Sequence, residues 1–164
     1  MIAEGEIAPG YRAPTNKGQT LSHESFVGRV PVALFFLDSL ESADDQLALD
    51  AFDELLVEFG RRRVQLLGVA PTTPRALRNA AEARSVTVLA DEDGAIRERF
   101  GGGAAPLTVV IDREGTVARV LERHSSDHPA EVLSEIDRLR ASDPDRMEPY
   151  EAAHDEFAPQ TNGG

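Results

Sequence analysis

Two largely apolar runs, separated by one amphipathic stretch, constrain the fold of this chain more than any other feature. The runs cover residues 30–37 and 64–70, and apolar runs of this kind are typical of strands buried on both faces. Between them, apolar residues recur at three- and four-residue spacing and predict a long helix over 44–59. These residues are Leu47, Leu49, Ala51, Phe52, Leu55, Leu56 and Phe59. We therefore expect a parallel strand–helix–strand unit in which 30–37 is the central strand.

The alternation of helix and strand continues after the second run. Thr73 and Pro74 are typical of an N-cap and a first helical position, so they predict a helix over 75–84. A strand over 86–90 and a short helix over 93–100 follow. Strands and helices that alternate in this way predict an α/β domain.

A hairpin and a last helix complete the predicted domain. Apolar segments over 107–112 and 117–121 flank a tight turn at 113–115, whose glycine can adopt a positive φ. Asp127 and Pro129 are typical of the start of a helix. One apolar stripe follows, formed by Val132, Leu133, Ile136 and Leu139.

The two ends of the chain differ from this pattern. Residues 5–17 are interrupted by proline and glycine, which predicts an extended arm with a short edge hairpin that includes 19–21. From Ser142 onward the apolar content is too low to predict a packed element. We therefore predict one domain over 1–141 and an acidic tail over 142–164.

Composition limits the classes of partner and site. The chain has 164 residues, no cysteine, and 29 acidic against 17 basic residues, for a formal charge of −12. This charge argues against a nucleic-acid or anionic-membrane surface. Only Lys17 is a lysine, and acid excess with few lysines resembles the composition of proteins from salt-loving archaea. The alternative is an ordinary acidic protein from a GC-rich genome that favours arginine codons. No segment resembles a signal peptide or a membrane span, so we expect a cytoplasmic protein.

Three polar clusters are interpreted as structural, and we expect no metal or cofactor. His124 and His128 enclose Asp127, but Pro129 puts His128 at a helix edge, so we expect an Asp127 N-cap flanked by surface histidines. Residues 91–93 are expected to form a solvated acidic turn, because the further ligands of a calcium loop are missing. The basic run 61–63 is expected to stabilise the end of the long helix.

The order and spacing of several short motifs resemble the alkyl hydroperoxide reductase/thiol-specific antioxidant family, the peroxiredoxins, and especially their bacterioferritin-comigratory type. The resemblance covers roughly residues 3–140. Its motifs are Gly5-x-x-Ala8-Pro9-x-Tyr11, Gly18-x-x-Leu21-Ser22, Val32 to Leu37, Leu67 to Pro71, Leu89-Ala-Asp91, Phe100-Gly101 and Val109 to Gly115. It implies a thioredoxin-like fold with a central mixed sheet flanked by helices, and a homodimer as one arrangement.

The family's active-site residues are absent at the matching positions. In the family, a Pro-x-x-x-Thr-x-x-Cys loop opens the long helix, and this match places Leu37 at the proline, Glu41 at the threonine and Asp44 at the cysteine. The family's arginine falls on Pro106. The segment that begins at Pro106 instead resembles the thioredoxin version, which implies a cis peptide after Ala105.

An aspartate does not replace the cysteine chemically. A carboxylate at a helix N-terminus is stabilised in its charged form, and it cannot be oxidised and recycled as a thiolate can. We therefore interpret Asp44 as a helix-capping residue and expect a redoxin domain that has lost thiol peroxidase chemistry and works as a binding or regulatory module. Two alternatives stay open: a family protein that acts with a partner's thiol, and an interaction protein that works through its acidic tail.

Overall fold

A computed structural model describes residues 2–101, 107–122 and 127–149, and these form one five-stranded sheet with helices around it. The elements are β1 (Arg12–Pro14), β2 (Thr20–Ser22), the 3₁₀ turn η1 (His23–Ser25), β3 (Val32–Phe36), α1 (Ala43–Arg61), β4 (Gln65–Ala70), α2 (Pro74–Ala81), β5 (Thr87–Ala90), α3 (Ala95–Arg99), β6 (Leu107–Ile111), β7 (Val117–Glu122), α4 (His128–Ser142) and α5 (Pro144–Met147). No helix of these described segments is long and apolar enough to cross a bilayer.

The sheet has the order β5-β4-β3-β6-β7, with β3 at its centre. Strands β3, β4 and β5 are parallel, whereas β6 and β7 are antiparallel and form the predicted hairpin. Every residue of β3 is buried, as a strand covered on both faces requires. The predicted mixed sheet, its central strand and the long helix are confirmed.

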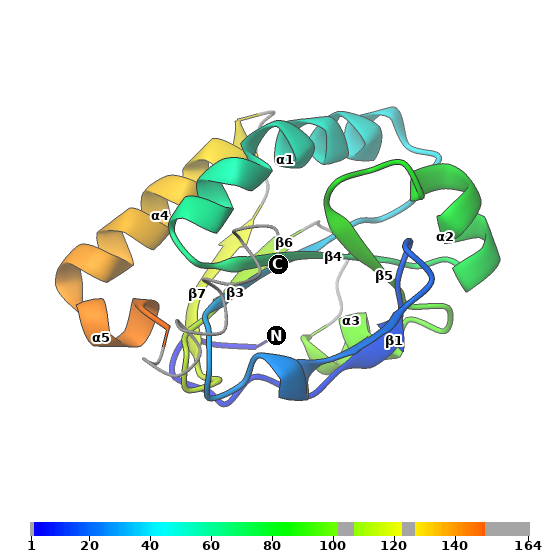
Figure 1. Cartoon of the computed structure of the whole chain (residues 1–164). Coiled ribbons are helices and arrows are strands. Elements are labelled where there is room, and N and C mark those ends of the chain that lie inside the picture. The colour runs from blue at the N-terminus through cyan, green and yellow to red at the C-terminus, as the bar shows by residue number, and fades with distance from the viewer. Residues whose placement is uncertain (1, 102–106, 123–126, 150–164) are drawn as a thin grey trace, which may run out of the picture.

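The sheet separates two apolar layers. Figure 1 shows α1 and α4 on one face and α3 with the N-terminal arm on the other. Side chains of β3 alternate between these layers, since Phe35 packs with the first and Phe36 with the second. Phe35 stacks on Phe52 of α1, with ring centroids 4.0 Å apart. Leu47, which the sequence places in the apolar stripe of α1, is instead 61% exposed, so the stripe is narrower than predicted.

The N-terminal arm forms the predicted hairpin as a separate sheet of β1 and β2, and Asn16 between the two strands ties it to the domain. The Asn16 side chain is fully buried. Its amide nitrogen donates to the carbonyls of Ala81 and Val86 at 2.8 and 3.1 Å, and its oxygen accepts from the amide of Val88 at 2.9 Å. The three bonds join the arm to the end of α2 and to β5.

The helix ends depart from the prediction by a few residues. Helix α2 has the predicted Thr73 cap, whose hydroxyl accepts from the Ala76 amide at 3.1 Å, but it ends at Ala81. Helix α1 continues through Gly60 to Arg61. The chain then reverses through Arg63, which has φ 56° and supplies the left-handed residue that a glycine supplies after many helices.

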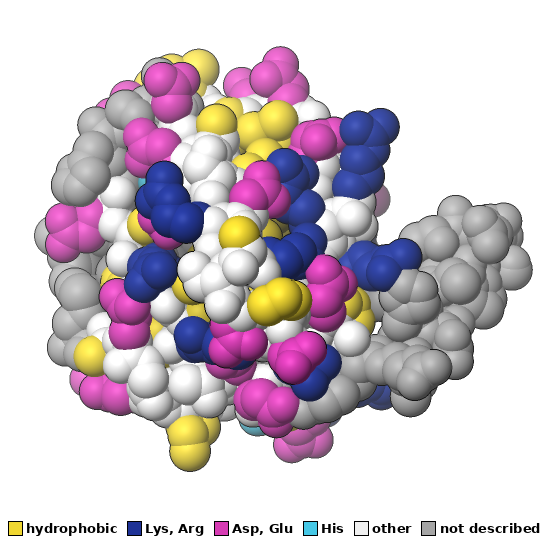
Figure 2. Space-filling view, turned by 90° about the vertical axis from the view of Figure 1, so that its left-hand side faces the viewer, with side chains coloured by type: hydrophobic (Ala, Val, Ile, Leu, Met, Phe, Trp, Pro, Cys, Tyr) yellow, Lys and Arg dark blue, Asp and Glu magenta, His cyan; other side chains and the backbone are white. Residues whose placement is uncertain are grey.

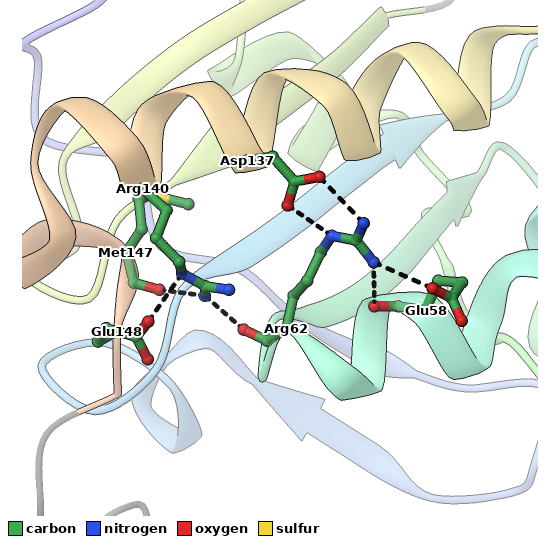
Figure 3. Close-up of polar contacts among 6 residues, drawn as sticks. All are labelled: Glu58, Arg62, Asp137, Arg140, Met147 and Glu148. Carbon is green, nitrogen blue, oxygen red and sulfur yellow. Dashed lines mark hydrogen bonds and ion pairs between the residues drawn. The ribbon is translucent and has the colours of Figure 1, made fainter.

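The prediction that no packed element follows residue 141 is wrong for the described residues up to 149. Helix α4 ends at Ser142 and α5 follows, with Met147 fully buried. Arg140 donates to the carbonyls of Arg62 and Met147 (Figure 3). Arg146 contacts Asp112 at 2.9 Å. Because Asp112 follows β6 at the amino end of β3, α5 packs at the sheet end remote from the β3–α1 loop. Residues 150–164 lie outside the described part.

The basic run at the end of α1 has an intramolecular role. Both Nε and Nη2 of Arg62 donate to the carboxylate of Asp137 on α4, at 2.7 and 3.0 Å (Figure 3). This hydrogen bond lowers the pKa of Asp137 and raises that of Arg62. Figure 2 shows arginine and acidic side chains interspersed on this side of the molecule. The Arg62–Asp137 pair therefore connects the end of α1 to α4.

Candidate functional site

The candidate site is the loop between β3 and α1, residues 37–42, because it carries the positions that match the family's active site. Parallel strands place their carboxyl ends at one edge, so the loop lies beside the segments that follow β4 and β5. The structure brings Leu37, Glu41 and Asp44 to this loop and the first turn of α1. Pro106, and the cis peptide expected before it, lie outside the described residues.

Leu37 directly follows β3 and contributes no reactive group. Its side chain is 1% exposed, and its amide donates to the carbonyl of Val69 at 2.9 Å. Its carbonyl accepts from Nη1 of Arg97, on α3, at 2.9 Å. Nη2 of the same guanidinium reaches a carboxylate oxygen of Asp38 at 2.6 Å. Arg97 therefore holds the start of the loop and is itself engaged by Asp38.

The interpretation of Asp44 as the helix cap is wrong, because Ser42 occupies that position. Ser42 has the extended backbone of an N-cap (φ −70°, ψ 131°), and its hydroxyl accepts from the Asp45 amide at 3.4 Å. Asp44 is the second residue of α1. Its side chain is exposed, as is that of Glu41. Neither side chain is directed into an enclosed site.

Asp45, not Asp44, is the carboxylate that organises this loop. It is 1% exposed, and its Oδ2 accepts from the amides of Asp38 and Ser39 at 2.7 and 2.8 Å. These amides and the N-terminus of α1 form a region of positive potential that suits an anion. The protein's own carboxylate already occupies it, so an external anion would have to displace Asp45.

Gln46 of α1 also binds the β3–α1 loop. The side-chain nitrogen of Gln46, Nε2, donates to the carbonyl of Leu40 at 2.5 Å. Its side-chain oxygen, Oε1, accepts from Arg84 at 2.8 Å. Arg84 also binds Asp50 and Asp53 of α1, the latter at 3.0 Å. The loop is thus bonded to α1 on one side and to α3 on the other.

A buried histidine lies beneath α1, which contradicts the expectation of surface histidines. His128 is 2% exposed, and its Nε2 lies 2.6 Å from the hydroxyl of Thr108 on β6. Its ring meets that of Phe52 edge-on at 6.3 Å. Asp127 occupies the N-cap position of α4 but makes no capping bond with its side chain. His124 lies outside the described residues.

The acidic turn at 91–93 is also only partly as predicted. Asp91 is 4% exposed, and its two carboxylate oxygens accept from the amides of Ile96 and Arg97, both at 3.0 Å. Asp91 therefore fixes the start of α3. It also holds the backbone of Arg97, whose side chain binds the β3–α1 loop. Within the described segments no three histidine or acidic side chains gather as a metal site would require.

Two residues that shape this site, Asp45 and Arg97, were not identified from the sequence. Ser42 followed by Asp45 has the spacing of a capping box, which is a usable signal for a helix start but not for a carboxylate that turns back to the preceding loop. Arg97 is 60 residues from the carbonyl it binds, and no local pattern marks such a contact.

Comparison with known proteins agrees with this geometry. Residues 5–120 match the AhpC/TSA family. A Coxiella burnetii protein that carries the name peroxiredoxin bcp is 24% identical over 150 residues, which cover 82% of this chain and 99% of that protein.

Solved structures show the same fold at low identity. Peroxidoxin BcpB from Mycobacterium tuberculosis has a TM-score of 0.75 and 23% identity, over 86% of this chain and 98% of its own. A cysteine-to-serine mutant of PrxQ from Xylella fastidiosa has a TM-score of 0.75 and 13% identity, over 84% and 97%. The thioredoxin-like fold and the resemblance stated from the sequence are confirmed: this chain belongs to the AhpC/TSA family.

Proposed function

We propose that this protein is a redoxin-fold domain that does not reduce peroxides and acts by binding another molecule. The observation that carries the proposal is the position of Asp45. Its carboxylate accepts from the amides of Asp38 and Ser39 in the β3–α1 loop, at the place where the family's sequence pattern has its cysteine loop. A site whose hydrogen-bond donors are already satisfied by the chain does not stabilise a bound peroxide or a thiolate.

The chemistry of the chain supports the same proposal. Reduction of a peroxide requires a group that gives up an electron pair and is then restored, and the chain has no cysteine. Carboxylates at Glu41 and Asp44 can accept a proton but cannot undergo that cycle. The residues present at the matched positions therefore favour retention of the fold for a purpose other than peroxide reduction.

The alternative hypothesis, in which a partner supplies the thiol, sets a condition on how that partner is bound. This chain cannot form a mixed disulfide, so a thiol-bearing partner would have to be held by non-covalent contacts alone. Such a complex would be insensitive to reductant, unlike the disulfide-linked intermediates of thiol chemistry.

The hypothesis that the protein interacts through its acidic tail is now limited to residues 150–164, because residues up to 149 pack on the domain.

A steady-state assay tests the proposal. The purified protein is mixed with hydrogen peroxide or an alkyl hydroperoxide and dithiothreitol, and peroxide loss is followed against buffer and against Asp44→Ala. We expect all three rates to be equal. Turnover by the metal-free wild-type protein that Asp44→Ala abolishes would contradict the proposal and assign a catalytic role to that carboxylate.

A further inference from the structure

We propose that Met147 is a peroxide-sensitive latch: oxidation of its thioether releases α5 from the domain. The chain contains two methionines, Met1 and Met147, and no cysteine, so these are its only sulfur-containing residues. Met147 is fully buried in the apolar cluster that lies between the sheet and helices α1 and α4. This inference is independent of the proposed binding function.

Helix α5 is attached to the domain through few groups. Of the segment 143–149, Met147 and Pro149 are buried, whereas residues 143–145 are exposed. The remaining attachments are polar: Arg140 donates to the Met147 carbonyl at 2.6 Å and lies 2.9 Å from Glu148 (Figure 3). Arg146 reaches Asp112 at 2.9 Å, and its carbonyl accepts from the Arg113 amide at 3.0 Å. One apolar side chain thus supplies most of the buried contact of α5 itself.

A helix of four residues has no stability of its own, so its attachment depends on these contacts. Segments of this kind open locally without global unfolding. When α5 opens, the Met147 sulfur meets solvent and any hydroperoxide in it. The buried position therefore slows oxidation without preventing it.

The chemical step is a two-electron oxygen transfer. A lone pair of the thioether sulfur attacks the terminal oxygen of a hydroperoxide, the O–O bond breaks, and a sulfur–oxygen bond forms. The departing oxygen takes the proton and leaves as water or an alcohol, so the sulfur is oxidised and the peroxide reduced. One peroxide is consumed per chain, and reversal needs a methionine sulfoxide reductase.

The product no longer fits the closed position. A sulfoxide is polar, and burying it in an apolar cluster without a hydrogen-bond partner is unfavourable. Oxidation should therefore trap α5 in the open state. The result is a change in the surface at the amino end of β3, remote from the β3–α1 loop.

The test combines an oxidation rate with a measure of release. Native protein is incubated with hydrogen peroxide beside N-acetylmethionine as an exposed thioether, and the sulfoxide at residue 147 is quantified by peptide mass. Release of α5 is followed by tryptic cleavage after Arg146. We expect oxidation slower than that of N-acetylmethionine by at least about tenfold, followed by faster cleavage in the oxidised fraction. Met147→Leu, which keeps the volume, should show no peroxide effect on cleavage, and Met147→Gln should be cleaved readily without peroxide.

Matched arginine variants separate local from global opening. Arg140→Gln removes the guanidinium's contacts with the Met147 carbonyl, the Arg62 carbonyl and Glu148. It should raise the oxidation rate by at least about tenfold, the effect on an opening equilibrium of losing one charge-assisted hydrogen bond. Arg138→Gln is the control, because Arg138 pairs with Glu135 on its own helix. Asn16→Ala, at the far side of the domain, controls for global destabilisation.

Three outcomes would overturn the latch. In the first, Met147 of the native protein stays reduced however long the incubation with peroxide continues. In the second, Asn16→Ala accelerates oxidation as much as Arg140→Gln, so that exposure requires global unfolding. In the third, oxidised protein is cleaved after Arg146 no faster than reduced protein.

Discussion

The Asp45 carboxylate accepts a hydrogen bond from the amide of Asp38 at 2.7 Å, and this contact joins the first turn of α1 to the end of the central strand. The same oxygen accepts from the next amide at 2.8 Å, so one buried charge satisfies two backbone donors of the loop. Charge-assisted bonds of this length are among the stronger ones in proteins. The pair explains both the shape of the loop and its lack of space for an external anion.

Replacement of Asp45 by alanine should therefore destabilise the fold. The variant removes a buried carboxylate and leaves two loop amides without this partner, and we expect the free energy of unfolding to fall by about 2–4 kcal/mol. Urea unfolding followed by circular dichroism measures the change. Asp44→Ala is the matched control and should cost less than about 1 kcal/mol, because this neighbouring carboxylate is exposed. Equal losses in the two variants would show that Asp45 has no special role.

Asn16→Ala should weaken the attachment of the N-terminal arm. Its side chain makes three bonds to backbone groups, and removing it takes this partner from the Val88 amide and the Val86 carbonyl, whereas the Ala81 carbonyl keeps the Arg84 amide. We expect a loss of about 2–4 kcal/mol. In Lys17→Ala, whose amine bonds the Ser85 carbonyl at the surface, the loss should stay below about 1 kcal/mol. A loss as small in Asn16→Ala would show that the arm is attached in another way.

The ion pair of Arg62 and Asp137 should contribute to stability only above acidic pH. The hydrogen bond from Arg62 lowers the pKa of Asp137 in the folded state, so the contribution is present above the unfolded value and is lost as pH falls through the folded one. Asp137→Asn should therefore flatten the pH dependence of the unfolding free energy below about pH 4. In an Arg62→Gln background the same substitution should have a smaller effect, because only the charge of Arg140 then still lowers the pKa of Asp137. An undiminished effect in that background would show that Arg62 is not the main cause.

Salt should raise the thermal stability of this protein. With a net charge of −12, repulsion among carboxylates acts over a Debye length of about 10 Å at 0.1 M salt and about 3 Å at 1 M. We expect the melting temperature to rise from dilute buffer to 1 M potassium chloride by more than that of a near-neutral control domain. A flat or falling melting temperature would favour arginine codon preference as the explanation of the composition.

The sheet could be predicted because its signals are local. Buried strands such as β3 and β4 are largely apolar runs, and α2 begins with the Thr73–Pro74 pair that the sequence identifies. Elements that depend on distant partners were missed. Segment 143–149 contains a single large apolar residue, Met147, and its packing depends on a pocket formed by other parts of the chain.

At the candidate site as well, local features could be predicted from the sequence, whereas contacts with distant residues could not. The sequence places Leu37, Glu41 and Asp44 around the start of the long helix, and the structure has Leu37 and Glu41 in the β3–α1 loop and Asp44 in the first turn of α1. The sequence does not reveal that Asp45 turns back to the loop amides, since an aspartate in the first turn of a helix is equally favourable when exposed. The burial of His128 was also missed, because its partner Thr108 lies on strand β6, 20 residues away.

Reinstating a thiol at the matched position gives the most direct test of the central claim. Asp44→Cys is reacted with hydrogen peroxide under pseudo-first-order conditions, and its oxidation is followed by intact mass beside N-acetylcysteine. If Asp45 already satisfies the loop amides, the new thiol receives no activation, and we expect its rate constant to lie within about tenfold of that of N-acetylcysteine. A rate constant more than about a hundredfold higher, with turnover in dithiothreitol, would show that the peroxide site is intact and that only the cysteine is missing.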